Sequence, residues 1–124
     1  MFYTGYYALT AKYKNAGLYT VGISGTVPQF YDGPRILEFA PRKEMFNRWK
    51  NGEIDNFGYH EEYVKYLDSL DKKDVRETLD ELKEHGDVIF LCYEKTGVFC
   101  HRHILADWLE NNFGEKVDEY GFDS

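Results

Sequence analysis

The sequence is poor in cysteine, in proline and in positive charge. Its 124 residues include two cysteines and three prolines, and the excess of Asp and Glu over Lys and Arg gives a net charge of −7. Two cysteines do not make the disulfide framework of a small secreted domain, so we expect free thiols in a cytoplasmic protein. The acidic balance excludes a general binder of phosphate backbones, which needs a basic surface. A small anionic ligand held by a few local cations stays open, and so does nucleic acid, although no basic patch is evident.

Long hydrophobic runs are also absent. No segment approaches the roughly 20 apolar residues of a membrane span, and the opening Met1-Phe2-Tyr3-Thr4 lacks the basic region and apolar core of a signal peptide. We therefore expect no contact with membranes. The length predicts one domain over residues 1–124, and the aromatic content of 18% predicts a core built from large side chains.

Periodicity predicts an α/β fold. Apolar runs indicate strands near 2–8, 18–23 and 88–93, and the last is apolar on both faces, as in a central strand. An irregular stretch covers 24–41. Helices are expected from Pro41 to Lys50, around 63–70, over 75–82 after an Asp71 or Asp74 cap, and from Thr96 to Asn112. We expect the tail at 115–124 to be frayed. We predict a single domain with a mainly parallel sheet, helices on both faces, and more helix than strand.

Chemistry is concentrated where the strand at 88–93 meets the last helix. The polar residues Glu94-Lys95-Thr96-Gly97 follow the strand, and the helix carries Cys100-His101-Arg102-His103. In open α/β sheets, ligands bind at corners of this kind, beyond the carboxyl ends of the strands. We therefore place the candidate site at residues 92–103.

Three residues of this corner are catalytic candidates: Cys100, His101 and Glu94. A thiol near a helix N-terminus has a lowered pKa, so Cys100 could be a nucleophile, with His101 as its base. Cys92 could then act as a resolving thiol. The alternatives are that Cys100 is a small buried hydrophobe and that His101 is a hydrogen-bonded core residue.

Arg102 and Lys95 are the candidate ligands for an anion at the helix start, where free N–H groups add positive potential. Cys92 would lie beside that anion. Ser24 and Gly25, at the end of the second strand, and Tyr31, as a stacking surface, complete the predicted ligand-binding set. The alternative for Arg102 is a salt bridge, with Glu94 as its expected partner.

Metal and phosphatase motifs do not fit the spacing. His101 and His103 lie two positions apart on a helix and face apart, so they would not share one ion, and the sequence has no Cys-x-x-Cys pair. An Arg six positions after either cysteine, as in phosphatase loops, is missing too. We expect no metal and no cofactor.

The corner resembles the domain of unknown function 488 family. The resemblance is carried by Leu91-Cys92-Tyr93-Glu94-Lys95, then Phe99-Cys100-His101-Arg102, then Leu105-Ala106-Asp107-Trp108-Leu109. Two segments match more weakly: Tyr3-Thr4-Gly5-Tyr6 and Ser24-Gly25-x-x-Pro28. At the second of these, many members of the family carry an Arg that is missing here. Ala40-Pro41-x-Lys43 and Trp49-Lys50 resemble a shorter subgroup found in bacteria and phages. The resemblance implies an α/β fold with a mainly parallel sheet, and no established activity.

Three functions stay open at this point. The first is binding, with or without processing, of a nucleotide or nucleic-acid component through an anion site at 92–103. The second is a Cys/His thiol enzyme or redox protein. The third is a non-catalytic interaction or inhibitor protein of a phage or bacterium. Whether the protein is an enzyme, and its oligomeric state, do not follow from the sequence.

Overall fold

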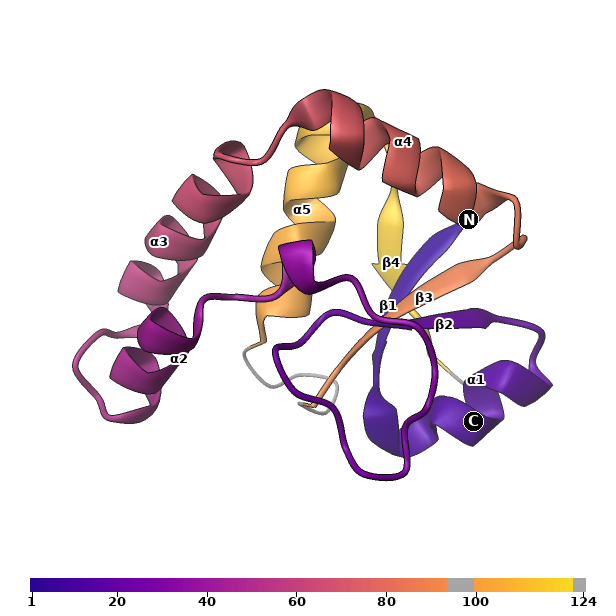
Figure 1. Cartoon of the computed structure of the whole chain (residues 1–124), viewed down its shortest axis with the longest axis horizontal. Coiled ribbons are helices and arrows are strands. Elements are labelled where there is room, and N and C mark those ends of the chain that lie inside the picture. The colour runs from indigo at the N-terminus through magenta and orange to yellow at the C-terminus, as the bar shows by residue number, and fades with distance from the viewer. Residues whose placement is uncertain (94–99, 122–124) are drawn as a thin grey trace.

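The computed structural model describes residues 1–93 and 100–121 and contains one four-stranded sheet (Figure 1). The strands are β1 (Phe2–Tyr6), β2 (Tyr19–Gly22), β3 (Val88–Cys92) and β4 (Val117–Glu119), in the order β2-β3-β1-β4. Every pairing is parallel. The predicted α/β class and parallel sheet are therefore confirmed, and β3 is central and buried at all five positions, as its sequence indicated.

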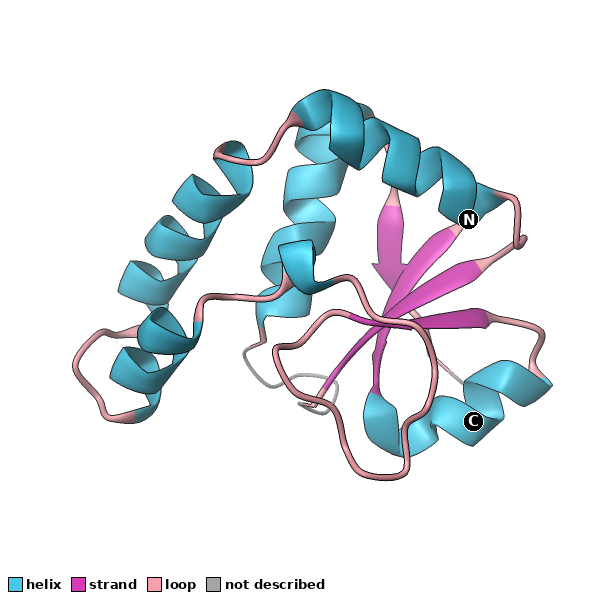
Figure 2. Cartoon of the chain, viewed as in Figure 1, coloured by secondary structure: helices cyan, strands magenta, loops and turns pink. Residues whose placement is uncertain are grey.

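Five α-helices and two 3-10 turns surround this sheet (Figure 2). The α-helices are α1 (Thr10–Asn15), α2 (Lys43–Lys50), α3 (Asn56–Asp68), α4 (Lys72–Lys83) and α5 (His101–Phe113). The 3-10 turns cover Tyr7–Leu9 and Leu37–Phe39. Asp71 caps α4 by accepting hydrogen bonds from the N–H groups of Lys73 and Asp74, as predicted. The short α1 was not predicted. No helix among residues 1–93 and 100–121 has the length and apolar character needed to cross a membrane.

Helices cover both faces of the sheet because successive strand residues point to opposite sides. On one face Phe2, Val88 and Phe90 pack in a large core with residues of α2 to α5. On the other face Ile89 and Leu91 pack in a smaller core with Tyr13 of α1. This two-sided burial explains why β3 is a continuous apolar run.

The parallel register brings three strand ends to one edge of the sheet. Tyr6 pairs with Cys92, and Gly22 pairs with Leu91. The chain leaving β2 therefore runs next to the end of β3, and the Ile23 N–H donates to the Leu91 carbonyl at 3.0 Å. This arrangement places residues 23–26 beside Cys92 and forms the floor of the candidate site.

The expectation of a frayed tail is wrong for residues 117–119, which form the edge strand β4 beside β1. Its acids are used in the fold. Glu119 accepts a 2.6 Å hydrogen bond from the Thr4 hydroxyl and pairs with Arg102 of α5. A three-residue strand stabilised by such distant partners leaves no hydrophobic pattern in the local sequence.

Candidate functional site

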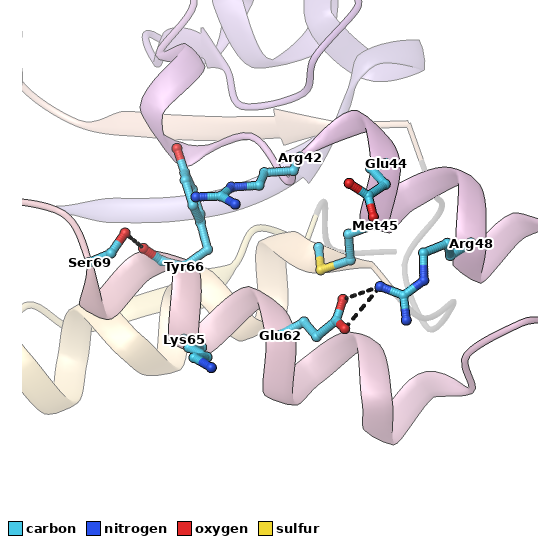
Figure 3. A pocket seen from close by; sticks show the side chains of 8 residues that line it. All are labelled: Arg42, Glu44, Met45, Arg48, Glu62, Lys65, Tyr66 and Ser69. Carbon is cyan, nitrogen blue, oxygen red and sulfur yellow. Dashed lines mark hydrogen bonds and ion pairs between the residues drawn. The ribbon is translucent and has the colours of Figure 1, made fainter.

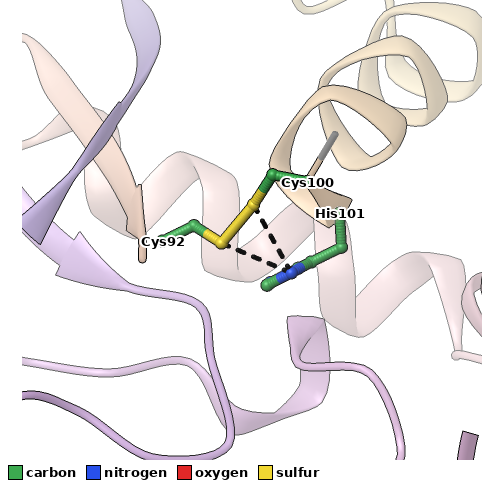
Figure 4. Close-up of side chains that lie close together, drawn as sticks. All are labelled: Cys92, Cys100 and His101. Carbon is green, nitrogen blue, oxygen red and sulfur yellow. Dashed lines mark hydrogen bonds between the residues drawn. A yellow bond between two sulfur atoms is a disulfide. The ribbon is translucent and has the colours of Figure 1, made fainter. Parts of the chain in front are cut away.

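Cys92 and Cys100 are joined by a disulfide at the corner between β3 and α5 (Figure 4). The prediction of free thiols is therefore wrong for this structure, whereas the predicted burial of Cys92 is confirmed, with 3% of its surface exposed. Cys100 is the N-cap residue of α5 and has extended backbone angles. It lies just before the helix and not at the end of its first turn, and its side chain makes no capping hydrogen bond.

The imidazole of His101 lies against both sulfurs, as Figure 4 shows. Its Nδ1 is 3.5 Å from the Cys92 sulfur and 3.9 Å from the Cys100 sulfur. Its Nε2 is 2.6 Å from the Ile23 carbonyl oxygen, which can only accept, so Nε2 carries the proton. Burial lowers the pKa of His101 to about 4, with the nearby Arg102 charge acting in the same direction. Near neutral pH the imidazole is therefore uncharged, and its Nδ1 lone pair faces the sulfurs.

The disulfide lies on the wall of a cavity of about 620 Å³ at the carboxyl edge of the sheet. Ser24, Gly25 and Thr26 line it from the chain after β2, and Cys92, Cys100 and His101 line it from the corner. Ser24 and Gly25 thus lie where the sequence placed them. The Ser24 hydroxyl is held by the Tyr7 hydroxyl at 2.6 Å.

The opposite wall comes from α2 and α3. Lys43, Phe46, Trp49 and Lys50 of α2 line the cavity together with the buried Tyr59 of α3. The Lys50 ammonium lies over the Phe46 ring, 5.6 Å from its centroid. Two cations and three aromatic rings therefore line the same cavity as the disulfide. Sequence reasoning missed these residues as site residues, although Pro41-x-Lys43 and Trp49-Lys50 were already visible as family-like motifs.

Arg102 does not face the cavity. Its guanidinium is fully buried and donates to both carboxylate oxygens of Glu119, at 3.1 and 2.9 Å. An arginine engaged in this way cannot serve as the anion fork that the sequence suggested. Arg102 lies on α5 as the sequence predicted, and its described ion-pair partner comes from β4, which the sequence did not reveal. Glu94, the partner expected from the sequence, lies outside the described residues.

The remaining predicted residues have different surroundings. Tyr31 is buried in the smaller core and donates to the Pro34 carbonyl at 2.7 Å, so it offers no stacking face to a ligand. His103 is half-buried and its pKa is lowered by burial. Glu94 and Lys95, and the proposed Thr96 cap, lie outside the described residues.

A second hollow of about 430 Å³ lies between α2 and α3 (Figure 3). Arg48 and Glu62 face each other across it with N–O distances of 3.0 and 3.2 Å. Arg42 lies over the Tyr66 ring at 5.3 Å from its centroid. In this hollow the Arg48 and Glu62 charges are paired with each other, so it is a weaker candidate than the cavity beside the disulfide.

In a comparison with protein-family models, the family described as the active DUF488-N3 subclade, a branch of the domain of unknown function 488, matches residues 10–113. Neither the curated proteins nor the solved structures contain a match. The matched region includes both cysteines, His101 and all of α2.

Proposed function

The chain belongs to the domain of unknown function 488 family, and from this premise we propose that it carries out reversible thiol–disulfide chemistry at Cys92 and Cys100. One observation carries the proposal: the bonded sulfurs form part of the wall of a cavity instead of lying in the closed core. We place the protein in the cytoplasm of a bacterium or of a phage-infected cell. Disulfides in that compartment are usually transient and catalytic or redox-sensing.

The substrate in this proposal is a small disulfide or thiol. The exposed fractions of Cys92 and Cys100 are 3% and 4%, so a large partner has little access to either sulfur. The cavity of about 620 Å³ has the usual size of a small-molecule site. A low-molecular-weight disulfide that enters it would meet both sulfurs and the His101 imidazole.

Cys100 is the attacking residue in this scheme. Its place at the start of α5 stabilises a thiolate through the free N–H groups and the positive end of the helix dipole. The Cys100 thiolate attacks one sulfur of the substrate disulfide and expels the other half as a thiolate. The Cys92 thiolate then attacks the Cys100 sulfur of the mixed disulfide and expels the second half. The substrate is reduced to two thiols, and the protein is oxidised to the Cys92–Cys100 disulfide.

His101 is positioned to accept a thiol proton in either step, because its Nδ1 lone pair faces both sulfurs. The Ile23 carbonyl holds the imidazole in the tautomer that leaves this nitrogen free. His101 then passes the proton to a leaving thiolate or to water in the cavity.

The test is a redox titration of the protein with mixtures of reduced and oxidised glutathione, followed by alkylation of free thiols and mass spectrometry. We expect the two thiols to disappear together as one two-electron couple. The chain has only two cysteines, so Cys92→Ser and Cys100→Ser should each leave one alkylated thiol or one glutathione adduct. Two thiols that stay fully alkylatable in excess oxidised glutathione would refute the proposal.

A second function, binding of a nucleotide, is supported by the composition of the cavity wall. Lys43 and Lys50 could neutralise phosphate, and Trp49 could stack on a base. In this proposal the phosphate-binding role moves from Arg102 to α2. The nucleotide could be free or part of a nucleic acid.

Calorimetric titration with a panel of nucleotides tests this second function. We expect Lys43→Ala and Lys50→Ala each to weaken binding by about tenfold or less, in line with exposed charge–charge contacts. Lys72→Ala, on the exposed start of α4, is the matched control and should bind normally. If the wild-type protein gives no heat of binding at millimolar nucleotide, this second function is excluded.

A further inference from the structure

We propose that the reduced protein binds one Zn²⁺ ion through the Cys92 sulfur, the Cys100 sulfur and Nδ1 of His101. These three atoms lie within 4.8 Å of one another. The inference rests on the proposed function in one respect, since the disulfide must open before the sulfurs can bind a metal.

Of the three distances between the proposed ligand atoms, the two that involve Nδ1 already match a tetrahedral zinc site. Zn–S and Zn–N bonds of about 2.3 and 2.05 Å place sulfur and nitrogen ligands about 3.6 Å apart, and two sulfurs about 3.8 Å apart. The two sulfur–Nδ1 distances are 3.5 and 3.9 Å. Only the sulfur–sulfur distance has to grow when the disulfide is reduced.

The backbone has room for that opening. The Cα atoms of Cys92 and Cys100 are 7.4 Å apart, beyond the usual disulfide range of about 4.4–6.8 Å. An ion between the two sulfurs therefore fits the existing strand and helix positions. The cysteines lie on separate rigid elements, β3 and the start of α5, which hold them at this spacing.

The imidazole is oriented as zinc ligands are. Metal-binding histidines usually donate their other N–H to a carbonyl or carboxylate, which fixes the tautomer and the ring plane. His101 does this through Nε2 and the Ile23 carbonyl at 2.6 Å. Because Nε2 carries the proton, the lone pair of Nδ1 faces the two sulfurs and is free to bind a metal.

The ligand types select a soft ion. Two thiolates and an imidazole favour Zn²⁺ over Mg²⁺ or Ca²⁺, which prefer oxygen. Two thiolates also neutralise the 2+ charge, as a site this deeply buried requires. In the part of the chain that the structure describes, no fourth His, Cys, Asp or Glu joins the cluster. Among the described residues, the fourth position is therefore open to water or to a ligand in the cavity, as in catalytic zinc sites.

Metal binding and disulfide formation exclude each other. Zinc entry releases two thiol protons, and oxidation of the two thiolates by a small disulfide releases Zn²⁺ and transfers two electrons to that disulfide. The ion therefore protects the thiols and makes the redox state of the corner depend on zinc supply.

The test uses the full chain, reduced under anaerobic conditions with a phosphine and freed of reductant. Titration with Co²⁺ as a spectroscopic substitute should give one equivalent of binding, with visible bands typical of tetrahedral cobalt and a sulfur-to-cobalt charge-transfer band. Zn²⁺ should displace it. Zn²⁺ should also protect both wild-type thiols from alkylation, a measurement that needs no variant.

Variants identify the ligands. Loss of outer partners of a metal site alone costs about 10–100-fold in affinity. Cys92→Ser, Cys100→Ser and His101→Gln should therefore each weaken Co²⁺ binding at least tenfold, and His103→Gln should bind like wild type. Circular dichroism checks that each variant is folded.

The outcomes separate this inference from the proposed function. Absence of one-equivalent binding by the reduced wild type, or unchanged alkylation in Zn²⁺, overturns the zinc site even if the disulfide forms reversibly. Binding that survives in folded His101→Gln overturns the assigned ligand set. Zinc binding in a protein whose thiols never form a disulfide with glutathione supports the metal site and refutes the redox function.

Discussion

Removing one partner of the Arg102–Glu119 ion pair should destabilise the fold and not act on ligand binding directly. The guanidinium is 0% exposed and the Glu119 side chain 22% exposed. The same carboxylate also accepts the Thr4 hydroxyl hydrogen bond, so it connects α5, β4 and β1. Glu119→Gln removes the carboxylate charge that this buried guanidinium is paired with.

The magnitude follows from burial. Breaking a fully buried pair costs about 3–5 kcal/mol. Because about a fifth of Glu119 reaches solvent, we expect Glu119→Gln to lower the free energy of unfolding by about 2–4 kcal/mol. Arg102→Met should cost a similar amount, and the double variant should cost clearly less than the sum of the two, since both members of the ion pair are removed together.

Urea unfolding monitored by circular dichroism measures these differences. Asp118→Asn is the matched control, because Asp118 neighbours Glu119 in β4 and is 48% exposed, with an ion pair to Lys116 at 3.9 Å. It should change stability by less than about 0.5 kcal/mol. A Glu119→Gln protein within that same margin of wild type would show that the pair does not stabilise the fold, and our account of Arg102 would then be wrong.

Three further predictions concern pH, packing and capping. His101, whose pKa falls to about 4 through burial, binds fewer protons in the folded than in the unfolded protein. Stability should therefore be complete above about pH 6.5 and decline toward pH 4 by up to about 3 kcal/mol, and a pH series of urea melts should show a smaller decline for His101→Gln. Gly5→Ala would place a Cβ 2.5 Å from the Tyr13 hydroxyl and 2.8 Å from Ile89. We expect it to lower the free energy of unfolding by about 1–3 kcal/mol, measured by thermal melts. Gly25→Ala, whose Cβ meets nothing within 4 Å, should leave stability nearly unchanged. Asp71→Ala removes the α4 cap and should lower stability by about 1 kcal/mol, while an unchanged melting temperature would contradict the capping role.

The elements that could be predicted from the sequence carry their signal locally. β3 is a continuous apolar run, and α4 has an acidic cap, an apolar stripe and Gly86 with positive φ beyond its end. The signals for α1 and β4 are weak. α1 has six residues and no side-chain cap, and β4 has three residues that depend on distant partners. Local pattern could not show either element.

The sequence indicated which stretch of the chain holds the candidate site, but it did not show which residues come together there. The approach of Cys92 to Cys100 depends on how α5 packs against β3, and the contact of His101 with Ile23 depends on the pairing of β2 with β3. The wall formed by α2 comes from a helix that ends 42 residues before Cys92. Motifs at Pro41-x-Lys43 and Trp49-Lys50 pointed to that helix, but nothing local indicated that it faces the corner.

The strand order has a consequence for how the nascent chain folds during synthesis. β1 leaves the ribosome before both of its neighbours in the sheet, β3 and β4, which begin more than eighty residues later. Until they emerge, the backbone of residues 2–6 has no sheet partner and Phe2 has no core. Parallel pairing across such separations is slow. β1 therefore stays unpaired until β3 has emerged. The Arg102 charge finds Glu119 only once β4 has emerged, so this ion pair forms after the other three strands have been made.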